Sequence, residues 1–337
     1  MNQPMAQERI LVIGGGIAGM QAAAVLREEG FSPLILERSS SLGGHVADWD
    51  RLFPTQLPAR EVIDELSAAV QEIETKIGCE IASLTSDASG VIAVTADGER
   101  YEGRAAVVTT GFDLFDARLK EEYGYGMYEN VVTSAELERM FRTGRVAMRS
   151  GEAPERVAIL HCVGSRDEKV GQFHCSKVCC ITGIKQAIEL TEAVPGVQVT
   201  NFYMDLRAFG NGYEELYRKS QVEHGVTYIR GRISEAGETL DKRIQLKVED
   251  TLVGRPLRMT VDMLVLLVGM RAPACCGSLG LPTQANGFFA PQNPYTGTVL
   301  STQRGVYLAG TATGPKTIGE TLNEAIAAAR RIKHDLK

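Results

Sequence analysis

The chain of 337 residues is long enough for two or three domains with ample cores. Hydrophobic residues make up 44% of it and charged residues 23%, values close to the averages of soluble globular proteins, which argues against intrinsic disorder and low-complexity architectures. The net charge of -6 comes from 36 basic and 42 acidic residues without a basic block, so no nucleic acid partner is expected.

Neither a membrane segment nor a secretory leader is expected. The longest apolar runs, such as residues 263–270, are less than half of the roughly 20 residues that cross a bilayer. Residues 1–9 lack the basic and then apolar order of a secretory signal. The sequence therefore predicts a cytoplasmic protein without direct membrane insertion.

Residues 10–30 predict a strand, a tight turn and a helix. The apolar run ILVI leads into GGGIAG, in which Gly14, Gly16 and Gly19 have the G-x-G-x-x-G spacing. This spacing permits a tight turn, close approach of the backbone to a pyrophosphate, and close helix packing. The helix N-terminus would then face the phosphates.

A second predicted strand, residues 31–36, ends in Glu37. An acidic residue about 20 positions after the glycines is the expected acceptor for a ribose hydroxyl. The surrounding pattern favours a dinucleotide site, and the alternative is a glycine turn that only packs a helix. The motif itself does not distinguish FAD from NAD, because both carry the adenosine diphosphate half.

Three further segments resemble flavoprotein disulfide reductases and favour FAD. Leu42-Gly43-Gly44-His45 resembles the paired-glycine loop beneath the pyrophosphate, VVTTG ending at Gly111 resembles the crossover strand, and residues 305–318 resemble the second FAD motif. Thr311 replaces the usual aspartate of that motif, which puts a carboxylate contact to the ribityl chain in doubt. The expected FAD contacts are Gly14, Gly16, Ala18, Gly19, Glu37, Arg38, Gly43, Gly44, His45, Gly111, Gly310, Thr311, Lys316, Thr317 and Ile318.

A second nucleotide-type unit is predicted after a boundary in residues 112–154, which hold no clear periodic core. It begins with a strand at residues 157–162, but no G-x-G-x-x-G follows that strand. A normal NAD(P)H site is therefore not expected in this part of the chain.

Four of the seven cysteines stand where those glycines would be: Cys162, Cys175, Cys179 and Cys180. If residues 176–190 are helical, Cys175 and Cys179 share a helix face, and Cys162 lies at the strand end where parallel sheets bind ligands. The spacing alone leaves three interpretations open: an iron-sulfur cluster, a structural zinc, and reduced core cysteines or a redox disulfide. Cys275 and Cys276 are interpreted as simple buried thiols or a labile pair.

Four segments, HCVGSRD, FHCSKVCCITGIKQA, FYMDLRAFGNGYEELY and AGTATGPKTI, resemble the family of heterodisulfide reductase A subunits, and the likeness covers nearly the whole chain. The resemblance implies FAD, a [4Fe-4S] cluster held by the four cysteines, a homodimer, and heterodisulfide reductase-like B and C subunits as partners. It also implies that Lys185 lies near the reactive edge of the flavin, with Glu136 as a weaker candidate for the same neighbourhood.

The chain also departs from the larger members of that family. Phe53-Pro54-Thr55 continues without a cysteine motif, so no further cluster and no flavin-based bifurcation are expected. The compact form most resembles the A component of heterodisulfide reductase-like complexes in sulfur oxidisers, and secondarily the A component of quinone-interacting membrane-bound oxidoreductases.

The expected fold is α/β, with two Rossmann-like domains of the thioredoxin reductase type. Residues 1–115 and 270–337 form a discontinuous FAD domain, residues 116–154 a linker region, and residues 155–269 an NAD-binding-like domain that carries the iron-sulfur site. The expected function is electron transfer in thiol or disulfide oxidation. The alternatives are a free-standing NAD(P)H-dependent flavin disulfide reductase, which would use Cys179 or a neighbouring thiol, and a silent scaffold that holds structural zinc.

Overall fold

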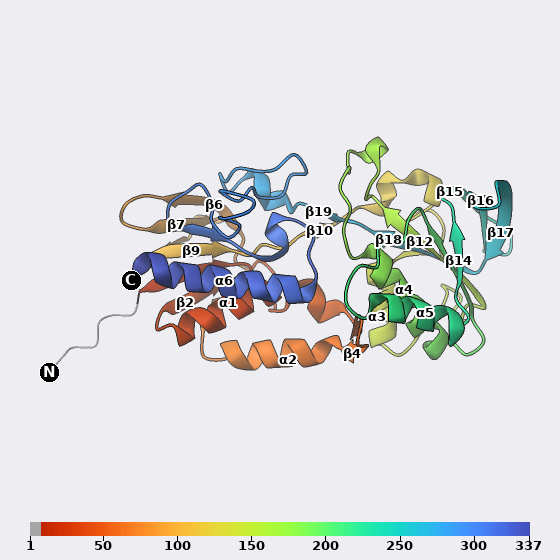
Figure 1. The fold of residues 1–337 in the computed structure, drawn as a ribbon, viewed down its shortest axis with the longest axis horizontal. Helices are drawn as coiled ribbons and strands as arrows, with labels where there is room; N and C mark the ends of the chain where they lie inside the picture. Colours follow the sequence, from red (N-terminus) through yellow and green to blue (C-terminus); the bar gives the residue numbers. More distant parts are fainter. Residues whose placement is uncertain (1–7) are drawn as a thin grey trace. The chain divides into compact units, whose positions relative to one another are not determined.

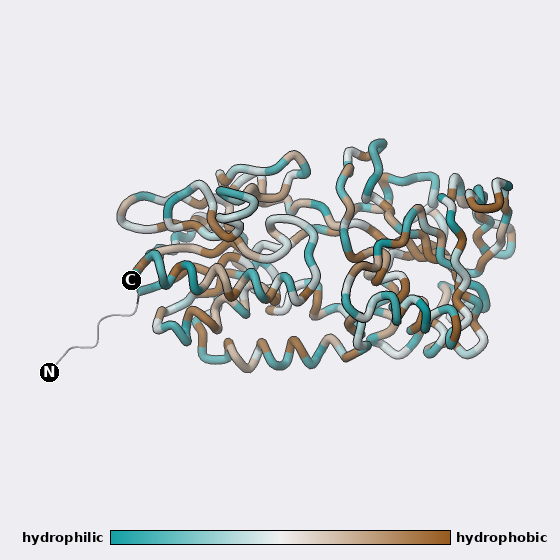
Figure 2. Tube along the Cα trace, in the orientation of Figure 1, coloured by the Kyte–Doolittle hydropathy of each residue, from teal (hydrophilic) through white to brown (hydrophobic). Residues whose placement is uncertain are grey.

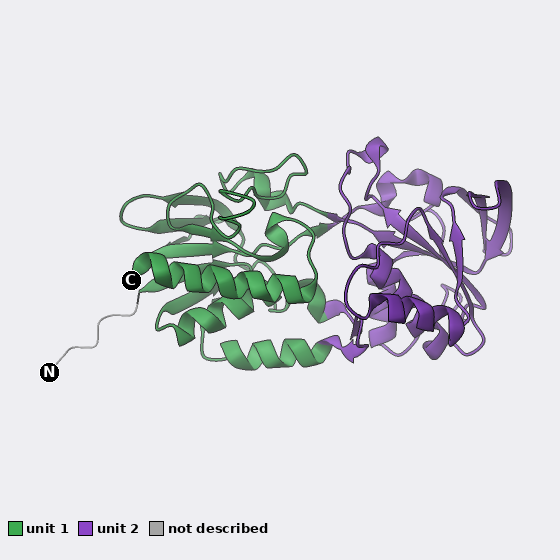
Figure 3. Ribbon diagram, viewed as in Figure 1, with its two compact units in different colours: residues 1–47, 60–113, 271–337 green, residues 48–59, 114–270 purple. Residues whose placement is uncertain are grey.

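The computed structural model describes residues 8–337, which form two compact units (Figure 3). Unit 1 consists of the residues up to Ala47, Arg60–Asp113 and Arg271–Lys337, and unit 2 of Asp48–Ala59 and Leu114–Met270. The expectation about a leader at residues 1–9 falls mostly outside the described residues. No helix of the described chain is long and apolar enough to cross a membrane.

Unit 1 is built on a parallel sheet of five strands in the order β20-β9-β1-β2-β5 (Figure 1). These strands are β1 (Arg9–Ile13), β2 (Ser32–Leu36), β5 (Glu74–Lys76), β9 (Ala105–Val108) and β20 (Val306–Leu308). The central position of β1 follows from its sequence, since a run that is apolar on both faces is stable only when both faces are covered. Its carboxyl end opens directly into the glycine turn.

Helices cover one face of this sheet, and an antiparallel meander covers the other. Helix α1 (Ile17–Glu28) packs beside α6 (Ile318–Leu336), although almost 300 residues separate them in the chain (Figure 1). The meander consists of β6 (Ile81–Ser86), β7 (Val91–Thr95) and β8 (Arg100–Gly103). Alternate residues of β1 and β2 form a buried cluster with the meander, as a period of two requires. Helix α2 (Ala59–Val70) precedes β5.

Unit 2 repeats the theme with a parallel sheet in the order β11-β18-β12-β13-β14. Its strands are β11 (Val131–Thr133), β12 (Arg156–Val163), β13 (Gln198–Tyr203), β14 (Thr227–Arg230) and β18 (Met263–Val268). One face packs against α3 (Ser134–Arg142) and α4 (Cys179–Ala193), and the other against an antiparallel sheet of β15 (Ile233–Glu238), β16 (Ile244–Asp250) and β17 (Arg255–Val261). Helix α5 (Tyr213–Val222) lies against α4. Hydrophobic residues concentrate along the central strands of each unit (Figure 2).

Four short strands complete the fold: β3 (Arg51–Leu52), β4 (Leu57–Pro58), β10 (Asp113–Leu114) and β19 (Met270–Arg271). The last two lie where the chain passes from one unit to the other. Residues 48–59, which we assigned to the FAD domain, belong to unit 2. Residues 116–154, which we assigned to a linker, supply unit 2 with β11 and α3. A strand of three residues is too short to show a period in the sequence, and its pairing with β18 is what defines it.

Candidate functional site

Three glycines shape the turn between β1 and α1, and they do so for different reasons. Gly14 has a φ of +104°, and a Cβ atom there would lie 2.5 Å from the Thr109 carbonyl oxygen. A Cβ on Gly19 would lie 1.8 Å from the Gly14 carbonyl oxygen. The nearest atom to a Cβ on Gly16 is the Gly44 Cα, 3.9 Å away. The protein's own packing therefore requires the first two glycines, whereas Gly16 faces open space.

Gly16 is also the N-cap of α1, and no side chain caps this helix. The first N–H groups of a helix need a partner, and a phosphate is one that also suits the helix dipole. The open surface at Gly16 and the uncapped helix end together form a cradle that fits the pyrophosphate of a dinucleotide. Ala18 is buried in the first turn of the same helix.

Glu37 fixes this turn from the neighbouring strand. Its Oε2 accepts a hydrogen bond of 2.5 Å from the Gly15 N–H, and its Oε1 accepts one of 2.7 Å from the Ser39 N–H. The side chain is only 7% exposed. Glu37 therefore orders the glycine turn, and its predicted contact with a ribose hydroxyl stays a prediction.

The paired-glycine loop lies against the turn. The Gly43 N–H donates to the Gly15 carbonyl at 2.9 Å, and Gly43 forms an isolated bridge with Gly16. The His45 Nε2 lies 2.9 Å from the Phe112 carbonyl oxygen, and the two rings stack 4.3 Å apart. The loop is thus joined to the segment that follows Gly111, and the structure brings both predicted segments to the carboxyl end of β1.

The C-terminal motif reaches the same end of the sheet. A Cβ on Gly310, whose φ is +72°, would lie 2.8 Å from the Ala18 Cβ, so this backbone passes close to α1. Gly111 faces Thr311, because a Cβ there would lie 3.8 Å from the Thr311 Oγ1. Thr317 caps α6 through a capping box with Glu320, and Ile318 is the first residue of that helix.

Glu324 is a residue of this region that the sequence analysis missed. Its Oε2 accepts a 2.8 Å hydrogen bond from the Gly310 N–H and lies 3.3 Å from the Lys316 Nζ, which also donates to the Gly310 carbonyl. Burial raises the pKa of the Glu324 carboxyl. Lys316 therefore orders the loop before α6, and only the fold brings the carboxylate of Glu324, beyond the motif in the sequence, to that loop.

The four cysteines lie together at the carboxyl end of the unit 2 sheet. Cys162 is the penultimate residue of β12, Cys179 and Cys180 are the first two residues of α4, and Cys175 lies in the loop between them. The first three are buried, and Cys175 is partly exposed. The Lys177 N–H points at the Cys175 Sγ at 3.3 Å, and the Cys180 Sγ lies 3.5 Å from the Asp205 carbonyl oxygen.

The expected helix over residues 176–190 begins later, at Cys179, and this corrects the argument that Cys175 and Cys179 share one helix face. Lys177 has a φ of +63°, which a helix cannot accommodate. Cys162 and Arg166 also have positive φ values, of 60° and 55°, and the register of β12 against β18 shifts between Leu160 and Val163. Such strain persists only where the surrounding structure enforces it, often at functional sites.

Electrostatics at this cluster oppose free thiolates. Burial and the charges of the other cysteines raise the pKa of Cys162 to about 12, and the same causes raise the pKa of Cys179. Burial raises the pKa of Cys180 as well. Thiols of this kind stay protonated and react slowly, whereas coordination to a metal cation would deprotonate them. In the described chain, no group of three or more His, Cys, Asp or Glu side chains is arranged to hold a metal ion.

A buried ion pair holds the loop that carries Cys175. The Lys120 Nζ lies 2.9 Å from the Asp167 Oδ2, and both side chains are almost fully buried. The Arg232 Nη2 lies 2.7 Å from the same carboxylate, which also caps the short helix at Glu168–Val170. Lys120 and Arg232 anchor the carboxylate of Asp167, and this anchor fixes the start of the loop.

Lys185 lies buried on α4 between two carboxylates. Its Nζ is 2.6 Å from the Glu138 Oε1 and 3.1 Å from the Glu189 Oε2, and it donates to the Arg51 carbonyl at 3.1 Å. The predicted role of Lys185 at a flavin stays a prediction. Glu136 does not join this group, because its side chain forms the capping box of α3, and Glu138 is the neighbour that the sequence analysis missed.

We expect Glu189 to make stability depend on pH. Burial raises its pKa from the ordinary 4.5 to about 8. Between these values the folded protein binds a proton that the unfolded chain releases, so stability falls as pH rises, by at most about 1.4 kcal/mol per pH unit. Thermal unfolding from about pH 5 to pH 8 should show this decline in the wild type and a flatter profile in Glu189→Gln. Glu192→Gln, an exposed carboxylate on the same helix, should keep the wild-type decline; equal profiles for all three proteins would contradict the assignment.

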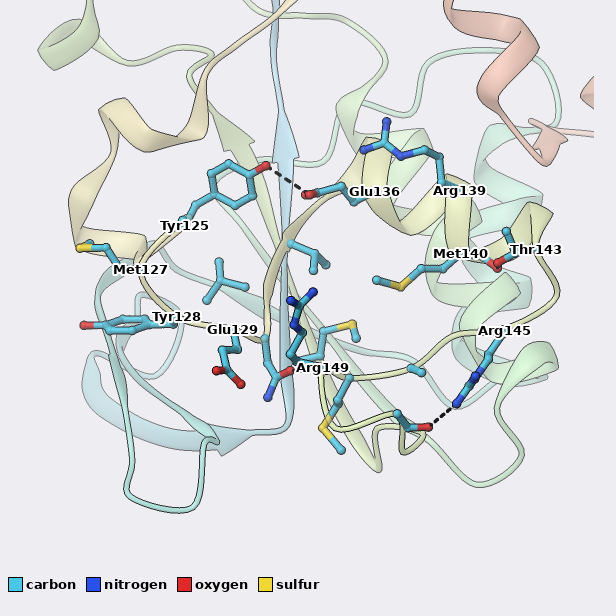
Figure 4. A pocket seen from close by; sticks show the side chains of 18 residues that line it. Tyr125, Met127, Tyr128, Glu129, Glu136, Arg139, Met140, Thr143, Arg145 and Arg149 are labelled. Atoms are coloured by element: carbon cyan, nitrogen blue, oxygen red, sulfur yellow. Dashed lines mark hydrogen bonds between the residues drawn. The ribbon is translucent and has the colours of Figure 1, made fainter.

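A separate cavity of about 930 Å³ opens at the amino end of β11 in unit 2 (Figure 4). Arg139, Arg145 and Arg149 line it together with tyrosines and methionines. The Tyr125 hydroxyl donates to Glu136 at 3.3 Å, and Arg145 donates to the Gly151 carbonyl at 3.0 Å (Figure 4). It lies at the opposite end of the strands from the cysteines, so it is not part of their site.

The family profile described as pyridine nucleotide-disulphide oxidoreductase matches residues 8–329. The chain belongs to this oxidoreductase family. Thioredoxin reductase of T. acidophilum matches 98% of this chain with a TM-score of 0.72 and 19% identity, over 99% of its own length. Bacillithiol disulfide reductase of Staphylococcus aureus matches 99% of this chain with a TM-score of 0.67 and 15% identity, over 100% of its length. The predicted α/β fold with two Rossmann-like domains is confirmed.

Among curated proteins, the chain is similar to components of heterodisulfide reductases. It is 33% identical to the A component of the H(2):CoB-CoM heterodisulfide,ferredoxin reductase of Methanothermobacter marburgensis, over 96% of this chain and 63% of that protein. The iron-sulfur A component of the CoB-CoM heterodisulfide reductase of Methanocaldococcus jannaschii has the same identity and coverage. The predicted resemblance to heterodisulfide reductase A subunits is confirmed. The chain spans less than two thirds of the length of these relatives.

Proposed function

We propose that the chain is an electron-transfer component of a heterodisulfide reductase-like complex, with FAD in unit 1 and a [4Fe-4S] cluster in unit 2, and that it acts in thiol or disulfide oxidation. One observation carries the proposal. Four cysteines converge at the carboxyl end of the unit 2 sheet, in the place where a nucleotide-binding domain has its glycine fingerprint.

The cradle of unit 1 supports FAD. Gly16 faces open space, α1 begins without a side-chain cap, and the loops at Gly43, Gly111 and Gly310 surround the same end of β1. Bound FAD would supply two-electron chemistry. The chain's own part is to bind the pyrophosphate through Gly16 and the α1 N-terminus, and to hold the turn rigid through Glu37.

The arrangement of the cysteines favours a cluster over a single zinc ion. Four thiolates around one zinc, with bonds of about 2.3 Å, have sulfurs about 3.8 Å apart. The described cysteines show no such single-ion group, although each lies within electrostatic range of the others. A [4Fe-4S] cluster binds each sulfur to a different iron and so accepts a wider set, and when bound it would supply single-electron transfer.

The disulfide reductase alternative receives less support from these residues. Cys179 is buried with a raised pKa, which is the opposite of a reactive thiol. The connection from β12 to α4 is a long loop without a G-x-G-x-x-G sequence, so a nicotinamide cofactor lacks its phosphate turn.

The relatives' names supply the rest of the proposal. Their designation by the letter A favours further subunits, and we propose a homodimer that binds heterodisulfide reductase-like B and C subunits. We expect co-purification with those subunits from the native host. Recovery of the chain only as a free monomer would contradict this part.

Cofactor analysis of the anaerobically purified chain tests the proposal. We expect about one FAD, about four irons and about four acid-labile sulfides per chain, with the EPR signal of a cluster after reduction. NAD(P)H alone should not bleach the flavin. Stoichiometric zinc would overturn the cluster in favour of a scaffold, and rapid bleaching by NAD(P)H without iron would favour a flavin disulfide reductase.

A further inference from the structure

We propose that Cys275 and Cys276 of unit 1 form a thiol-disulfide exchange site for low-molecular-weight disulfides. This pair is distinct from the four cysteines of unit 2, and its chemistry does not depend on the proposed cofactors. The pair lies on a short 3-10 helix at Ala274–Gly277. The assignment rests on how that helix places one thiol at the surface and the second behind it.

The helix geometry gives the two thiols different exposure. The Cys276 N–H donates to the Pro273 carbonyl at 3.0 Å, and the Cys275 carbonyl accepts from the N–H groups of Ser278 and Leu279. Cys276 is 6% exposed and belongs to the core of unit 1, whereas Cys275 is partly exposed. A small molecule can therefore reach Cys275, and Cys276 is placed to react only after Cys275 has done so.

A fixed cation lies beside this helix. The Asp113 Oδ2 accepts from the Ala274 N–H at 3.0 Å, and its Oδ1 lies 3.1 Å from the Arg38 Nη2. The Thr110 hydroxyl is buried and has no hydrogen-bond partner apart from the Cys275 sulfur among the described residues. Arg38 and Thr110 can thus stabilise a negative charge on Cys275.

The electrostatic balance distinguishes this pair from the four cysteines of unit 2. A hydrogen bond from Cys276 lowers the pKa of Cys275 to about 7, with Thr110 and Arg38 acting in the same direction against burial and Asp113. The pKa of Cys276 is raised, because its proton is shared with the Cys275 sulfur. Cys275 is therefore the nucleophile and Cys276 the resolving thiol.

The exchange consists of two balanced steps. The Cys275 thiolate attacks one sulfur of a disulfide RSSR, which forms a Cys275–SR mixed disulfide and releases the thiolate RS⁻. Cys276 then gives its proton to solvent and attacks the Cys275 sulfur, which forms a Cys275–Cys276 disulfide and releases the second RS⁻. The dithiol is oxidised by two electrons, and the substrate disulfide is reduced to two thiols.

The product disulfide should be labile. Adjacent Cα atoms lie about 3.8 Å apart across a trans peptide, whereas ordinary disulfides join Cα atoms about 4.4–6.8 Å apart. Joining neighbours therefore strains the chain, and strained disulfides are readily reduced. Such a pair suits reversible exchange better than structural cross-linking.

Oxidised glutathione serves as the probe, with the reduced full-length protein containing its native cofactors and with peptide mass spectrometry as the readout. Cys276→Ser should accumulate a stable glutathione adduct on Cys275. The wild type should lose two hydrogen atoms from the peptide with both cysteines, and Cys275→Ser should gain no adduct on Cys276. Cys79→Ala removes another buried thiol of unit 1 and should behave like the wild type. An unmodified Cys275 in Cys276→Ser, or equal labelling of Cys276 in Cys275→Ser, would overturn the proposal.

The pH dependence of Cys275 alkylation in the wild type tests the site without any substitution. The groups that face this thiol are Cys276, Thr110, Arg38 and Asp113. For a thiol with a pKa of about 7 the rate should rise about tenfold between pH 6 and pH 8, whereas an ordinary thiol near 8.5 rises roughly 75-fold. An increase of the larger size would remove the nucleophile from the proposal and overturn it.

Discussion

Cys179→Ser should abolish the iron-sulfur cluster while leaving FAD bound. Cys179 is the first residue of α4 and is buried, so no water or other side chain can replace its sulfur. Serine remains protonated at neutral pH and is a poor ligand for iron, which binds thiolates in these clusters. We expect iron and sulfide to fall at least about tenfold, measured on anaerobically purified protein. The FAD cradle belongs to unit 1, so the flavin content should not change.

The matched control for this experiment is Cys79→Ala, which removes a buried cysteine of the other unit. It should retain iron, sulfide and flavin. Cys175→Ser is a graded case, because Cys175 is partly exposed and solvent can reach its position. We expect a degraded cluster there rather than complete loss. If Cys179→Ser kept the full iron and sulfide content, Cys179 would not be a ligand and the four-cysteine assignment would be wrong.

The sequence predicted the dinucleotide turn well because its constraints are local. Gly14 and Gly19 are required by atoms within the same strand-turn-helix unit or on the adjacent strand, and their spacing encodes that geometry. Glu324 could not be found in this way. It lies in a helix with ordinary amphipathic spacing, and only the approach of α6 to Gly310 gives its carboxylate a partner. Contacts between distant segments leave no period in the sequence.

The cysteine region shows a second limit of prediction. Helix propensity favoured a helix from residue 176, but the strained backbone at Lys177 delays α4 until Cys179. A left-handed lysine is costly, so the sequence gives no warning of it. The choice of Glu136 over Glu138 has a similar cause. Both lie on α3, and the capping box with Thr133 occupies one while the packing of α3 against α4 brings the other to Lys185.

Gly16→Val should abolish FAD binding without unfolding the protein. The backbone at Gly16 has a φ of -71° and a ψ of -176°, which valine adopts readily, and the nearest atom to its Cβ is 3.9 Å away. The only space that the new side chain fills is the proposed pyrophosphate cradle. We expect at least a tenfold loss of FAD affinity, equivalent to about 1.4 kcal/mol, measured by flavin absorbance and titration of the stripped protein with FAD.

Two comparisons separate loss of binding from loss of fold. Gly19→Ala forces a Cβ to within 1.8 Å of the Gly14 carbonyl oxygen and should lower the thermal midpoint of the flavin-free protein, because backbone must move to admit it. Gly16→Val should unfold at the same temperature as flavin-stripped wild type, which removes the stabilisation that bound FAD itself confers. Gly237→Val, at a strand position with open surroundings in unit 2, should bind FAD normally. Normal FAD affinity in Gly16→Val would show that the open space beside α1 is not where the pyrophosphate binds.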